Sequence, residues 1–594
     1  FLCWLEFTKH VREESKKLQE NISSEIANCL LSQQPFLSWF HSFQRTASLD
    51  MRQKFTLMGH RTVCLYSAMC LVFSCLLSSS YHCSILFDLL VLMRQYLLLR
   101  FNSRVVLILG SFLTVGAAIN YAGVVLYGAA AAIEAMSGFS SAYAILLSGV
   151  VCTIYTSIGG IKAVIWTDVF QAIIIMAGVT YVTISGVKAS SGFSHIWEIN
   201  KAWNRLNFFD FDPDPTKRLN FYGCVFGTAF TCAGVFGYIQ SGVQRYASLP
   251  TIQQAKWSVF ATIPGHIIVN ILSCFSGLVL FSYYADIGCD PLKAGYIPSP
   301  NHILPYFMAT EIGTPVLTGL FLSSLIASSL STASSSLNSS GANTWEDVLK
   351  YWYPDMKEER KAFWLKILVA GYGVVAMVVA FAITLFSGLI NQIINTVSSC
   401  LQGPAAGLFF IGAFIPWVNS KGAIVGSISG FIFGLWCVIG SFYSSAQWQP
   451  MPSSIENCTT EIFSNVTTAV TSMPYNTTII DFMEEGRPEI TGISRLYNVS
   501  FMWKREVVTA FTVGVAILVS LVTGIRKPKS IPPHLVHPII RRFVGKDITK
   551  EDIVKDSNGL KEETEFLNGK TAKDKEMIEL QSEDERKKFD VTAT

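Results

Sequence analysis

A segment near the middle of the chain combines the length of a membrane span with an unusual number of hydroxyl side chains. Residues 317–340 are otherwise apolar but carry ten serines together with Thr332 and Asn338. Hydrocarbon penalises a hydroxyl that finds no partner, so these side chains are expected to face protein, water or an ion rather than lipid. Helical spacing of i, i+3, i+4 and i+7 places four of them on one face, namely Ser328, Ser331, Thr332 and Ser335.

This row of hydroxyl oxygens has two interpretations. Hard cations prefer oxygen ligands, so four oxygens stacked along a helix suit a sodium ion. Small residues also let transmembrane helices approach closely, so the same serines suit a helix–helix packing surface. The segment by itself favours neither interpretation over the other.

An acidic residue in a neighbouring apolar stretch adds a second polar feature. Gly159 and Gly160 interrupt helical propensity, which predicts a break between two spans, and Lys162 follows at the cytoplasmic boundary. Asp168 then lies about two turns into the next span. An acid within a span costs roughly a few kcal/mol and usually marks an ion pathway or an ion pair. Asp168 is therefore a candidate for an ion pathway, and the alternatives are a boundary residue wetted from the cytoplasm or a structural partner of Lys162.

Polar side chains also mark the cytoplasmic end of the predicted span 222–240. Gln240, Gln244 and Arg245 lie where this span leaves the membrane. Gln240 is a candidate contact for a polar substrate, whereas Arg245 is better explained as an anchor whose charge reaches back to the interface.

The composition indicates a multi-pass helical membrane protein. Of its 594 residues, 51% are hydrophobic and 15% are charged, against roughly 25% charged in average soluble chains. The net charge of +3 comes without a basic stripe interleaved with aromatics, so a nucleic-acid partner is not expected. No nucleophile–base pair or phosphate-binding loop points to an enzyme. Apolar runs predict spans near residues 105–127, 140–158, 164–186, 222–240, 257–282, 306–338, 364–388, 392–417, 421–442 and 507–525.

Glycosylation signals and charge set the expected orientation. The segment 443–506 contains four N-x-S/T sequons, at Asn457, Asn465, Asn476 and Asn498, which favours an extracellular glycosylated loop. Counting spans back from this loop places 341–363 and the tail 526–594 in the cytoplasm, in agreement with the positive-inside rule. The tail is rich in Lys, Glu and Asp and is expected to be mostly disordered. Cys289 and Cys458 fall on the extracellular side and are candidates for a disulfide.

Three motifs, in order along the chain, carry a resemblance to a known family. They are GGIKAVIWTDVFQ (159–171), VQRYASLPTIQQAK (243–256) and GLFLSSLIASSLSTASSSLNSSGANTWEDVLK (319–350). Together they resemble the sodium/solute symporter family, and the resemblance covers residues 96–525. The Ser331-Thr332 pair and the ending TWEDVLK resemble its animal branch of sodium-coupled monocarboxylate, multivitamin and iodide carriers more than its glucose branch.

The resemblance implies a fold, an activity and a site. The implied fold is LeuT-type: an all-α polytopic membrane protein of two inverted five-helix repeats, with its sites at the membrane midplane. The implied activity is sodium-coupled import of a small organic anion across the plasma membrane, monocarboxylate-like first and a vitamin or iodide second, with sodium co-transported and no organic cofactor. By resemblance, Ser328, Ser331 and Thr332 contribute to a shared sodium site, and Asp168 and Ser335 match positions tied to a further sodium in some members.

The N-terminal part departs from the family pattern. Residues 1–60 form an atypical segment ahead of a transporter domain expected over 61–525. Leu57–Tyr81 keeps only the LMGxR start of the broken first core helix, which in family members supplies backbone carbonyls to the shared sodium site. A non-transporting relative is therefore one alternative, and a channel that conducts sodium along the hydroxyl row is another. Ile239 stands where the family commonly has asparagine, so the substrate stays open, and the sequence does not indicate an oligomeric state.

Overall fold

The computed structural model describes the chain from Met93 to Val544 with gaps. The gaps lie at 204, 207–209, 238, 243–251, 299, 313–314, 386–389, 445–452, 459–491, 528–530, 533–534, 538–539 and 542–543. Residues 1–92 and 545–594 lie outside the described residues, and so do the predictions made for them. Outside the described residues lie the atypical segment 1–60, the first core helix at Leu57–Tyr81 and the sequons at Asn465 and Asn476.

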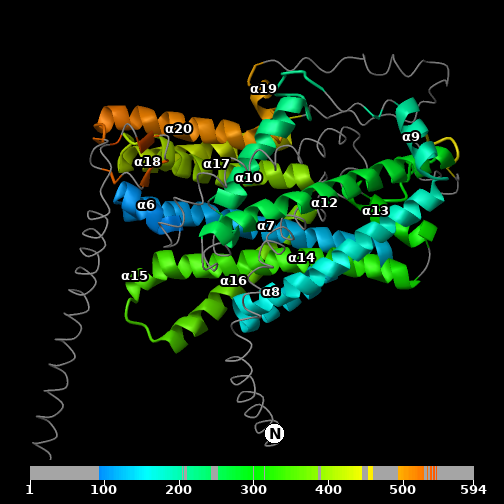
Figure 1. Cartoon of the computed structure of the whole chain (residues 1–594), viewed down its shortest axis with the longest axis horizontal. Coiled ribbons are helices and arrows are strands. Elements are labelled where there is room, and N and C mark those ends of the chain that lie inside the picture. The colour runs from blue at the N-terminus through cyan, green and yellow to red at the C-terminus, as the bar shows by residue number, and fades with distance from the viewer. Residues whose placement is uncertain are drawn as a thin grey trace, which may run out of the picture.

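The described residues are built from helices, and no strand occurs among them (Figure 1). In chain order the helices are α6 (Met93–Phe101), α7 (Arg104–Ser137), α8 (Ser141–Ala189), α9 (Phe193–Ala202), η2 (Gly223–Gly227), α10 (Thr228–Gly237), α12 (Ile252–Ile287), η3 (Pro300–His302), α13 (Ile303–Phe307), η4 (Met308–Ile312), α14 (Pro315–Thr344), η5 (Trp345–Leu349), α15 (Lys350–Trp352), α16 (Glu358–Thr384), α17 (Ile390–Phe414), α18 (Ser420–Tyr443), α19 (Ser494–Tyr497) and α20 (Lys504–Thr523). The predicted all-α class is confirmed.

Seven helical segments of the described chain are long and apolar enough to cross a membrane, judged by length and composition. They are Arg104–Ser137, Ser141–Gly159, Thr318–Trp352, Glu358–Thr384, Ile393–Phe414, Ser420–Tyr443 and Lys504–Thr523. The pair Ile173–Ala189 and Phe193–Ala202, bent by 78°, is an eighth candidate. The prediction of a multi-pass helical membrane protein is confirmed. The predicted spans 222–240 and 257–282 correspond to α10, which follows the π-turn η2, and to α12, which contains Pro264.

The helical residues of α8 follow one another without a gap, but the chain reverses direction within the length of α8. The thiol of Cys152 lies 3.7 Å from the carbonyl oxygen of Leu330 in α14. Asp168 accepts a hydrogen bond from Ser331, the very next residue of α14. Sixteen residues of straight helix would separate Cys152 from Asp168 by about 24 Å, which is too far for both contacts. The chain therefore turns back between them, and this interval contains the break that the sequence predicts at residues 159–160.

The serine-rich helix α14 lies among α7, α8 and α16 (Figure 1). In the span Thr318–Trp352, 72% of the most apolar window is buried inside the protein, against 22% for Lys504–Thr523. Ala333 and Leu337 of α14 belong to an apolar cluster with residues of α7, α8 and α16. The helix with the most hydroxyls thus faces protein on most of its surface, as its composition leads us to expect.

A second group of helices, α17, α18 and α20, packs together with α6. Arg100 of α6 is fully buried and binds the end of α17. Its Nε donates to the carbonyl oxygen of Gly412 at 3.0 Å, and its Nη2 donates to those of Ile415 and Pro416 at 3.0 and 3.1 Å. Carbonyl groups at a helix C-terminus lack partners within the helix, so this arginine caps α17.

The chain that follows α20 also packs on this second group. Ile531, Leu535 and Val536 are buried in the same apolar cluster as α6 and α17. The ring of His537 stacks on Phe414 with 4.7 Å between centroids. The start of the tail therefore packs against α17 through its apolar side chains. The overall composition of the tail does not reveal them, because the remainder of the tail is highly charged.

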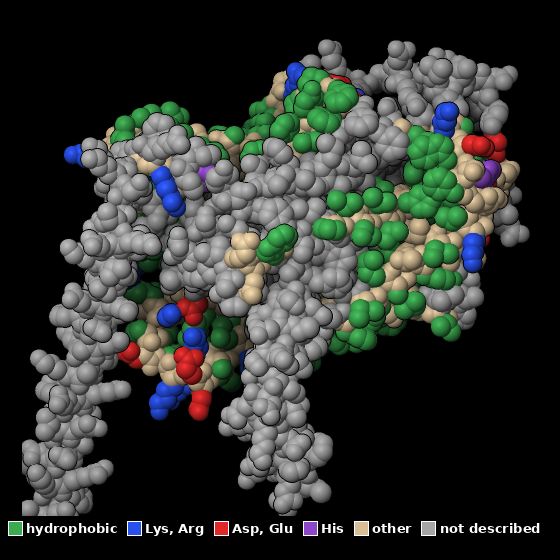
Figure 2. All heavy atoms as spheres, viewed as in Figure 1, with side chains coloured by type: hydrophobic (Ala, Val, Ile, Leu, Met, Phe, Trp, Pro, Cys, Tyr) green, Lys and Arg blue, Asp and Glu red, His purple; other side chains and the backbone are tan. Residues whose placement is uncertain are grey.

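Charged side chains gather at the two ends of the helix bundle (Figure 2). At one end, Glu346 forms ion pairs with Lys350 at 2.8 Å and with Lys361 at 3.6 Å, next to α15 and the start of α16. At the other end, His195 of α9 lies 2.9 Å from Asp286 at the end of α12. Many large hydrophobic side chains of the spans between these ends are exposed, among them Val374, Val378 and Ile432, as a membrane-crossing bundle requires.

Candidate functional site

The two polar features that the sequence singles out meet in the protein interior. Ser331 of α14 is fully buried, Asp168 of α8 is 2% exposed, and the Ser331 hydroxyl donates a hydrogen bond to Oδ1 of Asp168. Lys162, the alternative partner considered for Asp168, has a side chain outside the described set. The contact leaves a carboxylate and a hydroxyl oxygen side by side where water has little access.

The other three hydroxyls of the predicted row are buried around this contact. Ser328 is 1% exposed, Thr332 is 3% exposed and Ser335 is 9% exposed. The Oγ atom of Ser328 is buried and makes no hydrogen bond within the described part of the chain. A buried hydroxyl left unpaired costs free energy, so its oxygen is available to a ligand that the protein chain does not itself supply.

Other serines of α14 have a different role. The hydroxyls of Ser324, Ser334 and Ser340 donate to carbonyl oxygens of their own helix, at 2.7, 2.9 and 2.8 Å. A Cβ atom added at Gly178 of α8 would lie 2.6 Å from the Ser324 hydroxyl, so the two helices are in direct contact there. These serines act as small packing residues. The packing interpretation of the segment therefore applies to these serines, and the sodium interpretation stays a prediction for the row of four hydroxyls.

Gln171 is a further polar residue at this contact that the sequence reasoning missed. It is 9% exposed, and its Oε1 makes no hydrogen bond within the described residues. Asp168 lies opposite Ser331 and Gly178 lies opposite Ser324, so α8 and α14 run antiparallel here. Gln171 is one helical turn after Asp168 and so lies at the level of Ser328. The Asp-to-Gln spacing of i, i+3 in WTDVFQ is the sequence signal that indicates it.

An aromatic side chain fixes α14 next to this site. The hydroxyl of Tyr155 in α8 donates to the carbonyl oxygen of Leu330 at 2.8 Å. Leu330 directly precedes Ser331 in the chain. This hydrogen bond holds the backbone that carries the Ser331 hydroxyl, so both halves of α8 contribute to the geometry of the site.

The structure describes Gln240, the predicted substrate residue, but only part of its surroundings. Gln240 is 5% exposed, and its Oε1 makes no hydrogen bond within the described residues. The residues that follow it, 243–251, lie in a gap of the description. No hydrogen bond joins Gln240 to Asp168 or Ser331 in the part of the chain described. Gln240 is thus a separate buried polar side chain and is not joined to the α8–α14 contact by a hydrogen bond among the described residues.

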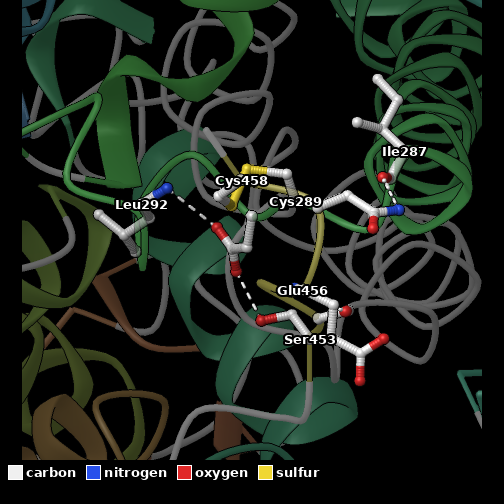
Figure 3. The surroundings of a disulfide bond; sticks show 9 residues. Ile287, Cys289, Leu292, Ser453, Glu456 and Cys458 are labelled. Carbon is white, nitrogen blue, oxygen red and sulfur yellow. Dashed lines mark hydrogen bonds between the residues drawn. A yellow bond between two sulfur atoms is a disulfide. The ribbon is translucent and has the colours of Figure 1, made fainter. Parts of the chain in front are cut away.

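The segments expected on the extracellular side are linked by a disulfide between Cys289 and Cys458 (Figure 3). Their Cα atoms are 5.0 Å apart, which is within the usual range for a disulfide. Of the four sequons, two lie among the described residues. Asn457 is exposed and its amide donates to the carbonyl oxygen of Ile287 at 2.9 Å. Asn498 is half-buried and its amide donates to the Ser444 hydroxyl at 2.7 Å.

Fold and site together define a polytopic helical membrane protein with a buried carboxylate–hydroxyl contact at its centre. A model of the sodium:solute symporter family matches residues 64–430, which is more than half of the chain. The chain belongs to the sodium:solute symporter family. The match begins within Leu57–Tyr81, so the family likeness reaches into the part of the chain that departs from the pattern.

Curated relatives agree with this assignment. Sodium-coupled monocarboxylate transporter 1 of Xenopus laevis is 38% identical over 437 residues, which cover 72% of this chain and 69% of that protein. The human sodium-coupled monocarboxylate transporter 1 is 34% identical over 483 residues, which cover 80% of this chain and 76% of that protein. The sodium-dependent multivitamin transporter of Oryctolagus cuniculus is 34% identical over 451 residues, which cover 76% of this chain and 69% of that protein.

A solved structure supports the fold. The outward-open, substrate-bound structure of a sodium-coupled sialic acid symporter superposes with a TM-score of 0.62 and covers 83% of this chain and 91% of that one. The sequence identity is 20%, so the comparison bears on the fold alone. The LeuT-type fold expected from the motifs is confirmed.

Proposed function

We propose that this protein is a symporter that couples the entry of sodium to the import of a small organic anion. The observation that carries the proposal is the buried contact between Ser331 and Asp168, beside the unpaired hydroxyl of Ser328. A fully buried carboxylate costs free energy unless a cation or hydrogen bonds compensate it. A sodium ion at this point would add a positive charge beside the buried carboxylate of Asp168, and the hydroxyls would supply neutral oxygen ligands.

Six residues of α8 and α14 are proposed to serve sodium. Ser328, Ser331 and Thr332 are proposed for the shared sodium site, and Asp168, which provides the negative charge, and Ser335 for a further sodium. Ser328 and Gln171 offer buried oxygen atoms that have no other hydrogen bond in the described chain. When sodium binds, the Ser331 hydroxyl turns its lone pairs to the ion, and the ion replaces the hydroxyl proton as the partner of Asp168.

Sodium binding is coupled to transport through the conformation it favours. An ion shifts a conformational equilibrium only by its difference in affinity for the two states. The sodium ligands lie on two antiparallel helices, α8 and α14, so relative movement of these helices changes the affinity. The membrane potential adds about 2.3 kcal/mol per charge per 100 mV in favour of inward movement.

The proposed topology follows the sequons. The loop 443–506 lies outside the cell, and the tail from residue 526 lies in the cytoplasm, with the plasma membrane as the location. The charged residues around Glu346, between α14 and α16, then face the cytoplasm, and the disulfide between Cys289 and Cys458 faces the oxidising exterior.

Monocarboxylates are the first choice of substrate. Relatives whose names describe sodium-coupled monocarboxylate transport support this choice, and a multivitamin transporter makes carboxylate-bearing vitamins the second. Gln240, whose buried amide oxygen makes no hydrogen bond among the described residues, is the proposed polar contact for the substrate.

The proposal is tested by uptake of labelled lactate, nicotinate, biotin and iodide into cells that express the chain. Uptake is measured in sodium medium and again in choline medium, with surface labelling in parallel. Sodium-dependent, saturable uptake of lactate or nicotinate is expected. A chain that reaches the surface and imports none of the four substrates would contradict the proposal and favour a non-transporting relative. Sodium current without any substrate would favour a channel instead.

A further inference from the structure

A pocket lies at the end of the bundle that carries α9 and the disulfide. It is lined by Trp203, Arg205, Phe281, Tyr284, Ala285, Asp290, Pro291, Ile303, Ser453 and Ser454. Its space, counted with the open solvent at its mouth, is about 490 Å³. The disulfide of Cys289 joins the two chain segments that close this pocket, so its walls are covalently held (Figure 3).

A buried cation forms one wall of the pocket. Arg205 is 5% exposed, and the central carbon of its guanidinium lies 3.1 Å from the centroid of the Phe281 ring. The ring face holds the planar guanidinium in one orientation. Burial lowers the pKa of the neighbouring Lys293, while the Asp290 charge raises it and the Arg205 charge lowers it. Nζ of Lys293 donates to the carbonyl oxygen of Ser453 at 3.2 Å, and Ser453 lines the pocket, so a second basic group lies beside it.

The acid at the pocket is already engaged by donors of its own. Oδ1 of Asp290 accepts from the backbone N–H of Leu292 at 2.9 Å, and Oδ2 accepts from the Ser453 hydroxyl at 2.6 Å (Figure 3). The hydroxyl of Tyr284, in contrast, is buried and makes no hydrogen bond within the described residues. The pocket therefore presents a cation and an unused hydroxyl donor, with a carboxylate whose oxygens are already hydrogen-bonded.

Aromatic rings make up the rest of the recognition surface. Trp203 meets Phe281 edge-on, with 5.8 Å between ring centroids, and Tyr284 lines the same pocket. Flat apolar walls beside a guanidinium suit a ligand that has both an acidic group and a ring. An inorganic anion would use the guanidinium but would leave the rings without contact.

We propose that this pocket is a second ligand site, which binds a small aromatic carboxylate independently of the sodium site. Arg205 and the Tyr284 hydroxyl bind the carboxylate, and Trp203 and Phe281 contact the ring. The site is separate in the fold from the α8–α14 contact, and its residues include none of the proposed sodium ligands. Its ligand belongs to the same broad chemical class as the proposed substrate, so the pocket can hold substrate or effector at the mouth of the transporter.

Binding of benzoate to the purified full-length chain tests the proposal. Isothermal titration is run in choline chloride without sodium, so that a sodium-dependent transport site contributes nothing. Benzamide, which keeps the ring and loses the charge, is the matched control ligand. Saturable binding of benzoate, and at least about tenfold weaker binding of benzamide, is expected from the loss of a hydrogen bond to a charged group.

Variants assign the binding to the pocket. Arg205→Gln is expected to weaken benzoate binding by about tenfold or more, and Tyr284→Phe, which keeps the ring, by about twofold to tenfold. Lys201→Gln removes an exposed lysine of α9, four residues before Arg205 in the chain, and is expected to leave binding unchanged. Intact glycosylation and a protected Cys289–Cys458 disulfide show that each variant is folded.

Three results would overturn the proposal. They are no benzoate binding by the unaltered chain, equal binding of benzamide and benzoate, or unchanged benzoate affinity in both single variants, Tyr284→Phe and Arg205→Gln. If Arg205→Gln does not fold, the Tyr284→Phe result decides alone, because loss of one hydroxyl leaves the ring packing in place. The outcome is independent of the uptake experiment. A chain that imports nothing still binds benzoate if the pocket is a ligand site.

Discussion

Buried hydroxyls occur at two helix contacts of this protein, and they behave differently in each. In the group α17, α18 and α20, Ser427 and Thr512 are fully buried. Their hydroxyls donate to carbonyl oxygens of their own helices, to Ala423 at 2.8 Å and to Val508 at 2.8 Å. These hydroxyls are satisfied locally and leave the helix surface free for close packing.

At the α8–α14 contact, two hydroxyls lack that local bond. Ser331 donates across the interface to Asp168, and Ser328 has no hydrogen bond in the described chain. Residue type and burial are the same at both contacts, so neither property separates packing from ligand binding. The destination of the hydroxyl hydrogen bond differs between the two contacts, and we propose that it separates packing from ligand binding. Four experiments test this distinction, from the largest expected effect to the smallest.

Removal of the charge at the α8–α14 contact has the largest expected effect. Asp168→Asn keeps the size of the side chain and abolishes its attraction for a cation. We expect the half-saturating sodium concentration for uptake to rise by about a hundredfold, since hydrogen bonds and contacts to charged groups contribute about 1.5–3 kcal/mol. Uptake measured against sodium concentration, corrected for surface expression, gives the answer. Unchanged sodium dependence would mean that Asp168 is only a structural partner of Ser331.

A matched pair of serine substitutions compares the two contacts directly. Ser331→Ala removes a hydroxyl bound to Asp168, and Ser427→Ala removes one bound to its own helix. We expect the first to raise the half-saturating sodium concentration by about tenfold and the second to leave it unchanged. Equal effects of the two variants on sodium dependence would contradict the distinction.

A glycine substitution tests the packing role of the second group. A Cβ atom at Gly422 of α18 would lie 2.0 Å from the Ser520 hydroxyl and 2.5 Å from the carbonyl oxygen of Ala516. Since a backbone carbonyl cannot rotate away, Gly422→Ala is expected to destabilise the protein by about 1–3 kcal/mol without a change in sodium affinity. Gly514→Ala on α20, where nothing lies within 4 Å, is the control. Thermal unfolding in detergent measures both; equal midpoints would contradict close packing at Gly422.

The unpaired hydroxyl gives the smallest expected effect. Ser328→Ala removes a buried polar atom that has no hydrogen bond in the described residues. We expect unchanged or slightly raised thermal stability, because no protein hydrogen bond is lost, and a twofold to fivefold (about 0.4–1 kcal/mol) weaker affinity for sodium. A clear loss of stability in the absence of sodium would show that Ser328 is part of the packing instead.

The sequence predicted the main parts of the fold and of the site for identifiable reasons. Hydroxyls at helical spacing within an apolar run predicted a buried face of α14, and an acid inside an apolar run singled out Asp168. Both signals are local in the chain and depend on the high cost of polar atoms in hydrocarbon. Their direct contact across 163 residues is tertiary and could be expected only from the family resemblance.

Other features were outside the reach of local patterns. The i, i+3 spacing places Gln171 near Asp168, but it does not show that the amide oxygen is buried and makes no hydrogen bond within the described residues. Gln240 was singled out from its place at a span end, and its role stays a prediction. The ordered start of the tail was missed because a few apolar residues, Leu535 among them, are outnumbered by charged residues further on.

The burial of Arg100 has a practical consequence for work on fragments of this protein. Arg100 caps α17 through three carbonyl oxygens, and its own carbonyl oxygen accepts from Nη1 of Arg526 at 2.6 Å. A truncation designed from the last apolar span would end near residue 525 and remove that arginine together with the apolar residues after it. The smallest fragment worth expressing therefore ends beyond Val544, and fusion tags belong after that point.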